Sequence, residues 1–106
     1  MSDCIFCKII AKQIPSEFIY EDDKCVAFKD INPKAKTHLL LVPRKHIASV
    51  AHMDNEDLAL MGHLIYTAKL LGEKNNLPHY NLQFNVGKGA GQEVFHVHMH
   101  LMSSAS

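Results

Sequence analysis

The sequence predicts an α+β domain in which a mostly antiparallel, five-stranded sheet carries one long and one short helix. Five segments have the alternating or β-prone composition of strands, whereas one long segment repeats its apolar residues every three or four positions. The chain has 106 residues, of which 47% are hydrophobic, and contains no internal repeat or linker. We therefore expect a single domain over residues 1–106.

The first half of the chain predicts the short helix and three strands. Residues 4–12 carry apolar side chains at helical spacing, and Pro15 ends this pattern. Residues 18–21 and 25–30 are expected to form a hairpin, because EDDK between them has turn composition. The unbroken apolar run of THLLLVPR, residues 37–44, is typical of a central strand.

The second half predicts the long helix and two further strands. The helix is expected to follow Asp54, a good N-cap, and to end at Gly72 or at the pair Asn75 and Asn76. Its expected apolar face consists of Leu58, Met61, Ile65, Ala68 and Leu71. YNLQFNV, residues 80–86, and VFHVHMHLM, residues 94–102, both alternate with the period of a strand.

The charge balance and the cysteine spacing indicate which partners, compartment and kind of site to expect. Eleven basic and eleven acidic side chains cancel, which argues against nucleic-acid and membrane-surface partners. The sequence has neither a secretory signal pattern nor an apolar run of about 18 residues, so we expect a cytoplasmic protein. In a reducing compartment, the Cys-x-x-Cys spacing of Cys4 and Cys7 indicates a metal site or a redox pair.

Three histidines near the C-terminal end give the clearest functional signal. His96, His98 and His100 alternate with apolar residues, so their imidazoles are predicted to face one cleft. Three imidazoles can hold a catalytic Zn²⁺, or one can act as a nucleophile that its neighbours orient. The glycine-rich VGKGAGQEV before them offers main-chain N–H groups, which favours a phosphate cradle beside a nucleophile.

QEVFHVHMHLM resembles the His-φ-His-φ-His-φ-φ signature, with φ apolar, of the histidine triad (HIT) family of nucleotide hydrolases and transferases. CIFCKIIAKQIPSEFIYEDD, AFKDINP, THLLLVPRKHI and GAGQEVFHVHMH resemble its nucleoside phosphoramidase branch, so the likeness spans nearly the whole chain. It implies a HIT-like fold. It also implies that His98 attacks the α-phosphorus of a purine nucleotide derivative, flanked by His96 and His100 and supported by His38.

The resemblance further implies a nucleotide-binding pocket. Asn85, Gln92 and the N–H groups of Glu93 and Val94 would hold the phosphate oxygens, where charge accumulates in the transition state. Asp30 would accept hydrogen bonds from the ribose hydroxyls. The base would be enclosed by the apolar residues Ile5, Phe6, Ile9, Phe28 and Ile31.

Two more features follow from the resemblance. Many relatives pair the Cys-x-x-Cys with a histidine of a PxxH segment and with the first triad histidine, which implies a structural Zn²⁺ on Cys4, Cys7, His46 and His96. Catalysis itself needs no cofactor in this scheme. The family also joins two subunits into one continuous sheet, which implies a homodimer.

The leading interpretation is hydrolysis of the P–N bond in adenylyl or guanylyl amines. The alternatives are a dinucleoside polyphosphate hydrolase of the same family and a nucleotide-binding regulatory or scaffold protein. Polyphosphate hydrolases tend to carry Gln-Asp-Gly where this chain has Asn85 in NVG, and Lys29 and Lys88 are the only obvious cations near the site in sequence. Two departures from the phosphoramidase pattern are LMSSAS, where the branch usually continues with a Leu-Gly-Gly stretch, and Glu93, where animal members often have serine.

Overall fold

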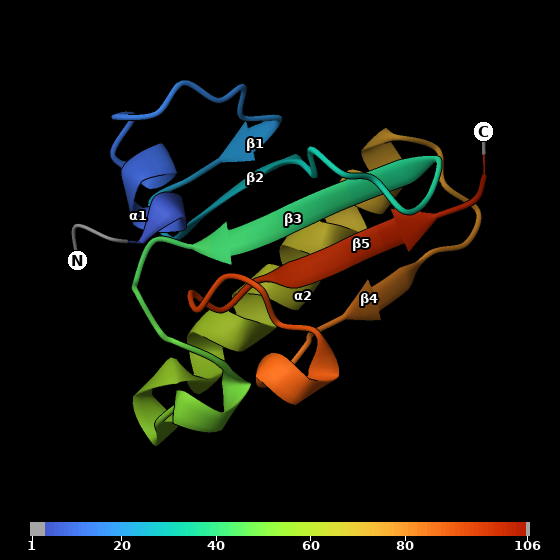
Figure 1. The fold of residues 1–106 in the computed structure, drawn as a ribbon. Coiled ribbons are helices and arrows are strands. Elements are labelled where there is room, and N and C mark those ends of the chain that lie inside the picture. The colour runs from blue at the N-terminus through green and yellow to red at the C-terminus, as the bar shows by residue number, and fades with distance from the viewer. Residues whose placement is uncertain (1–3, 106) are drawn as a thin grey trace.

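The computed structural model describes residues 4–105 and has the predicted α+β architecture. All strand pairs are antiparallel, and the five strands lie in the order β1-β2-β3-β5-β4. The long helix α2 covers one face of the sheet, while the short helix α1 lies on the other face near β2 (Figure 1). The elements are α1 (Ile5–Ile10), β1 (Tyr20–Glu21), β2 (Cys25–Lys29), β3 (Thr37–Pro43), α2 (Leu58–Lys74), β4 (Asn81–Gln83) and β5 (Met99–Ser103).

Each face of the sheet has its own apolar core. The larger core joins α2 to Leu39, Leu41 and Leu101, and the smaller one joins α1 to Phe28 and Val42. Because successive residues of a strand point to opposite faces, β3 contributes to both cores, which explains its unbroken apolar run. None of the helices within residues 4–105 is long and apolar enough to cross a membrane.

The predicted hairpin forms between β1 and β2, and Asp22 closes its turn. Its Oδ1 accepts hydrogen bonds from the N–H groups of Lys24 and Cys25 at 2.8 Å each, and its Oδ2 lies 2.7 Å from both Tyr20 Oη and His63 Nε2. Partial burial favours a higher pKa, yet these hydrogen bonds hold the pKa of Asp22 well below its usual range. Since His63 belongs to α2, this carboxylate ties the turn to the helix.

The buried face of α2 differs in part from the predicted one. Leu58 and Ile65 are 64% and 51% exposed, whereas Leu64, which was not predicted, is fully buried. The stripes Leu58–Met61–Ile65 and Met61–Leu64–Ala68 both have helical spacing, so the periodicity alone does not choose between them. The sheet packs against the second stripe. A 3₁₀ turn over Asn55–Asp57 precedes α2, so Asp54 caps that turn rather than the helix.

The last two strands are shorter than predicted. β4 spans Asn81–Gln83, and β5 begins at Met99, so His100 is the one triad histidine within a strand. The preceding segment bonds to a loop instead of a strand: Val97 N–H donates to the Ile47 carbonyl at 2.6 Å. The alternation still holds before the strand begins, because Val97, Met99 and Leu101 pack in the α2 core while the rings of His96 and His98 both contact Phe6 on the other face.

Candidate active site and metal cluster

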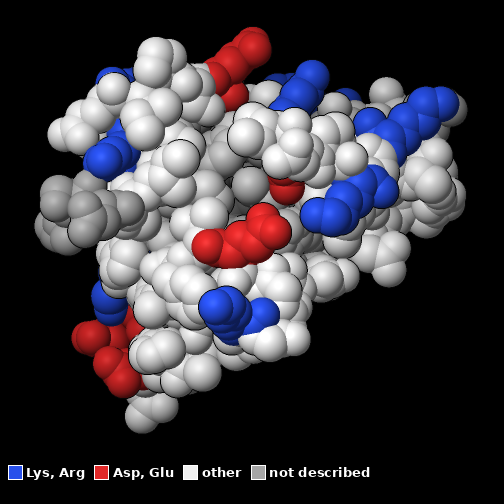
Figure 2. Space-filling view, viewed as in Figure 1, with Lys and Arg blue, Asp and Glu red and all other residues white. Residues whose placement is uncertain are grey.

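A pocket of about 480 Å³ opens on the sheet face opposite α2. Figure 2 shows this side of the molecule, with acidic atoms near its centre and basic atoms around them. One end of the pocket is formed by α1, the end of β2 and the β2–β3 loop, and the other end by the segment before β5. Its lining includes these predicted nucleotide-binding and catalytic residues: Ile5, Phe6, Ile9, Phe28, Asp30, Ile31, Asn85, Glu93, Val94, His98 and His100.

His98 presents a free ring nitrogen to this pocket. Its Nδ1 lies 2.8 Å from the carbonyl oxygen of His96, so Nδ1 carries the proton and donates it. Nε2 consequently keeps its lone pair. Burial lowers the pKa of His98, which favours the neutral imidazole that a nucleophile requires. Phe6 packs against the ring in an edge-on contact, with centroids 5.1 Å apart.

A chain of hydrogen bonds sets the protonation of His100. The N–H of Lys34 donates to His38 Nδ1 at 3.0 Å, so the proton of His38 is on Nε2, which lies 2.8 Å from His100 Nδ1. His100 must then carry its own proton on Nε2. Among the described residues, this Nε2 is the one buried side-chain polar atom without a partner. Burial lowers the pKa of His100 to about 4, so the ring is neutral at pH 7, and its residue lines the pocket with a buried Nε2–H that has no acceptor.

The glycine-rich segment forms the other wall. Gly87 and Gly91 both have φ of 92°, a left-handed conformation that glycine adopts without strain. The main-chain N–H groups of Glu93 and Val94, two residues that line the pocket, have no acceptor within residues 4–105. Two adjacent free N–H groups of this kind can bind an anion.

Gln92 and His96 lie outside the pocket, contrary to the expectation from the sequence. The Gln92 side chain is buried, and its oxygen accepts from the N–H of Gly87 at 2.9 Å while its nitrogen donates to the carbonyls of Ala48 and Val94. It therefore holds the loop in shape and leaves no amide group for a phosphate. The His96 ring is fully buried and turns toward α1.

The apolar end of the pocket, where the sequence predicted the base, is more open than expected. Ile31 is 91% exposed and Ile5 is 47% exposed, so both lie at the rim, while Phe6, Ile9 and Phe28 are buried beneath them. Asp30 accepts a hydrogen bond from the N–H of Asn32 at 2.8 Å, and its other oxygen lies 3.4 Å from His38 Nε2. Asp30 thus lines the pocket and also contacts the histidine chain.

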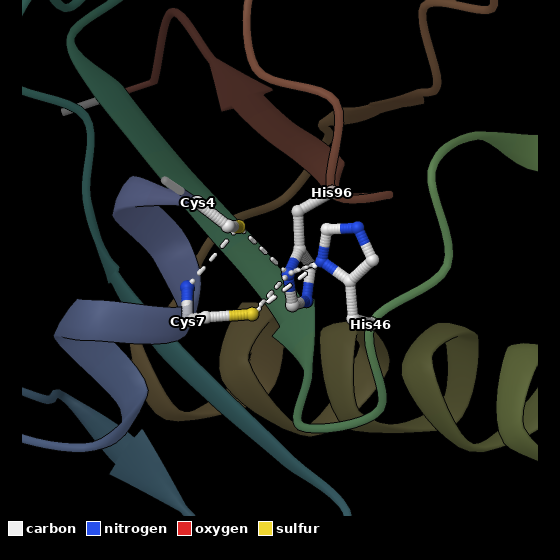
Figure 3. Close-up of side chains that lie close together, drawn as sticks. All are labelled: Cys4, Cys7, His46 and His96. Carbon is white, nitrogen blue, oxygen red and sulfur yellow. Dashed lines mark hydrogen bonds between the residues drawn. The ribbon is translucent and has the colours of Figure 1, made fainter. Parts of the chain in front are cut away.

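Cys4, Cys7, His46 and His96 form a second cluster beside the pocket (Figure 3). His96 Nδ1 lies 3.4 Å from Cys4 Sγ, 3.5 Å from Cys7 Sγ and 3.1 Å from His46 Nδ1, and Cys7 Sγ lies 3.4 Å from His46 Nδ1. Ligands of a tetrahedral Zn²⁺ are separated by roughly 3.3–3.8 Å, so the sulfur–nitrogen spacings fit that ion and the two imidazole nitrogens lie slightly closer together than it requires. The sequence predicted this set through a resemblance, and the fold brings all four residues together.

The protonation of His96 also suits a metal ligand. Its Nε2 donates to the carbonyl of Pro43 at 2.8 Å, which leaves the Nδ1 lone pair directed at the two sulfur atoms. Burial lowers the pKa of His96 to about 4, so this nitrogen is unprotonated at neutral pH. Another group, Asp22, Cys25 and His63, is less suitable, because hydrogen bonds occupy both Asp22 oxygens and burial raises the pKa of the Cys25 thiol to about 11.

Comparisons with known proteins agree with this geometry. Residues 3–106 match the family model described as "Scavenger mRNA decapping enzyme C-term binding". Protein HitA of Neisseria gonorrhoeae is 46% identical over 105 residues, covering 98% of each chain. A 14 kDa zinc-binding protein of Zea mays is 39% identical over 104 residues, covering 95% of this chain and 81% of the maize protein.

Solved structures are also similar. A HIT family hydrolase from Legionella pneumophila Philadelphia 1 has a TM-score of 0.93 and 42% identity, and the match covers 98% of this chain and 95% of that one. The shared fold, the histidine signature and the high identity over nearly the full length lead to one conclusion. The chain belongs to the histidine triad (HIT) family and has the fold of the family's hydrolases.

Proposed function

We propose that this protein hydrolyses the P–N bond of purine nucleoside 5′-phosphoramidates through a nucleotidyl-histidine intermediate on His98. The observation that carries the proposal is the hydrogen bond from His98 Nδ1 to the His96 carbonyl, because it leaves Nε2 free inside the pocket. A neutral imidazole with one nitrogen tied to a main-chain acceptor is suited to covalent catalysis.

The first step transfers the nucleotide to the protein. The Nε2 lone pair of His98 attacks the α-phosphorus, and the P–N bond breaks with its electron pair remaining on the amine nitrogen. That nitrogen takes up one proton from solvent and leaves as an amine. The phosphorylated ring is positively charged, and the His96 carbonyl that accepts its Nδ1–H stabilises this charge.

The second step releases the nucleoside monophosphate. Water attacks the phosphorus, the bond to Nε2 breaks with its electron pair returning to the ring, and one proton passes to solvent. In both steps the phosphoryl oxygens gain negative charge. The N–H groups of Glu93 and Val94 and the Nε2–H of His100 are the free donors that we assign to those oxygens, while Asp30 holds the ribose.

The charges around the pocket favour an amine over a polyphosphate as leaving group. Lys29 and Lys34 line the pocket together with Asp30 and Glu93, so the cations and anions balance. Lys88, which the sequence placed near the site, does not line it, whereas Lys34 does. A polyphosphate leaving group is anionic and requires extra cationic contacts that this lining does not supply.

A side-by-side kinetic comparison tests the proposal. We expect kcat/KM for adenosine 5′-phosphoramidate to be well above that for diadenosine tetraphosphate, with AMP and GMP as competitive inhibitors. Faster hydrolysis of the polyphosphate would assign the chain to the dinucleoside polyphosphate hydrolases. Binding of AMP without turnover of either substrate would favour a regulatory or scaffold role.

We further propose that Cys4, Cys7, His46 and His96 hold one structural Zn²⁺. Two thiolates and two imidazoles complete a tetrahedron and leave no position for substrate, so the ion would join α1 to the segments around β3 and β5. The maize relative's name agrees with this assignment. Thiols of this kind stay reduced in the cytoplasm, which we propose as the compartment of this single-domain protein.

We also propose a homodimer. β4 is an edge strand, and its Leu82 is 38% exposed, while Leu58, Ile65 and Tyr66 project from α2 with 51–64% exposure. An edge strand beside exposed apolar residues is suited to pairing with a second copy, which would extend the sheet and cover these side chains. Light scattering should give twice the chain mass at micromolar concentration. A monomer mass would reject this arrangement.

A further inference from the structure

Glu93 is the pocket carboxylate that makes no hydrogen bond or ion pair with residues 4–105. Its side chain is exposed and lines the cavity, and it has no hydrogen-bond or ion-pair partner within residues 4–105. The other pocket carboxylate, Asp30, is engaged with Asn32 and His38. No hydrogen bond or ion pair within residues 4–105 therefore explains why position 93 carries a negative charge.

Glu93 lies at the end of the pocket through which the leaving amine is expected to depart. In a direct displacement, the leaving nitrogen departs on the side of the phosphorus opposite to His98 Nε2. The nucleoside occupies the end formed by α1, Asp30 and Ile31, so the leaving amine has to exit toward the end formed by Asn85, Gly91 and Glu93. The Glu93 carboxylate lies at that exit, next to the two N–H groups assigned to the phosphate.

We infer that the Glu93 side chain selects phosphoramidates whose leaving amine carries a second, positively charged group, as diamines and lysine-type amines do. This inference rests on the proposed function and names the substrate class of the same site. The carboxylate attracts an ammonium on the departing chain and repels an anionic leaving group. For exposed charges such an attraction is modest, so the expected selectivity is roughly two- to fivefold.

A matched pair of substrates isolates this effect. Adenosine 5′-phosphoramidates of 1,4-diaminobutane and of n-pentylamine differ chiefly in an ammonium that replaces a methyl group. The ratio of their kcat/KM values is measured for the wild-type protein, for Glu93→Gln and for Glu17→Gln. Glu17 is an exposed acidic residue that does not line the pocket, so it controls for the loss of one negative charge. The ratio is insensitive to a general loss of activity.

The wild-type ratio should favour the diamine, and Glu93→Gln should lower it by roughly two- to fivefold, with a smaller change in about 0.5 M salt because exposed charges are screened. Glu17→Gln should leave the ratio unchanged. The same ratio in wild type and Glu93→Gln would overturn the inference while turnover of both compounds upheld the proposed function. No turnover of either compound would overturn both.

Discussion

His96 and His98 are separated by one residue and have opposite environments. Each donates one ring N–H to a main-chain carbonyl at 2.8 Å, His96 through Nε2 to Pro43 and His98 through Nδ1 to His96 itself. His96 is therefore left with an unprotonated Nδ1 that faces the Cys and His cluster, and His98 with an unprotonated Nε2 in the pocket. The backbone acceptor decides which nitrogen is available, and so separates a metal ligand from a nucleophile within one short segment.

The largest expected effect comes from removing the free Nε2 in the pocket. His98→Asn should lower kcat for adenosine 5′-phosphoramidate by at least ~10³-fold, because no nucleophile remains for the covalent step. AMP should still bind, since the assigned phosphate donors include main-chain N–H groups. Steady-state kinetics and calorimetric AMP binding measure the two effects. Near-normal turnover would remove His98 from the role of nucleophile.

Disrupting the Cys and His cluster that contains His96 should lower stability rather than activity. Replacing Cys4 and Cys7 together by serine should abolish zinc binding and lower the free energy of unfolding by about 2–4 kcal/mol, or roughly 10 °C or more in Tm. At temperatures where the variant is folded, kcat should fall much less than in His98→Asn. Metal analysis of protein purified without added zinc or chelator should give one Zn²⁺ per chain. Absence of metal, with both thiols freely titratable, would contradict the assignment.

His38 should have a smaller effect, because it acts through His100. Its Nε2–H donates to His100 Nδ1, so removing it frees His100 to place its proton on the wrong nitrogen. His38→Ala should lower kcat about tenfold with little change in KM, an effect typical of supporting hydrogen-bond partners. His38→Gln, whose amide nitrogen can replace the donor, should recover part of the loss. Equal kcat values in the two variants, at equal stability, would reject this role.

His63 provides a third environment, in which a histidine ring contacts the carboxylate of Asp22. The pKa of Asp22 is lowered in the folded state, so its carboxylate stabilises the fold above the ordinary value of 3.8 and loses this effect as the pH falls below it. Asp22→Asn should cost about 1–2 kcal/mol at pH 7. The difference from wild type should shrink in unfolding experiments below about pH 4. Asp23→Asn, at a side chain that is 87% exposed, should change stability little at either pH.

The spacing of apolar residues predicted the order of helices and strands better than it predicted the residues where they begin and end. The order of helices and strands was correct, because each element has its own apolar period. The start of β5 was not predictable, since the bond from Val97 to Ile47 depends on a loop distant in sequence. For the same reason the separate positions of His96 and His98, and the use of the Gln92 amide within its own loop, required the structure. The protonation of His100 Nε2 was also not predictable from the sequence, because it depends on contacts with Lys34 and His38.

The proposed mechanism requires that His98 Nε2 becomes covalently bonded to phosphorus, and mass spectrometry of the digested protein tests this most directly. The protein is mixed with an adenosine 5′-phosphoramidate, quenched in alkali within the first turnover, digested and mapped. We expect an adenylyl group on His98 that is absent from His98→Asn and acid-labile, as a P–N bond to imidazole should be. A mapped adduct on another residue, or turnover that a chelator stops while no adduct forms in the wild-type protein, would contradict it.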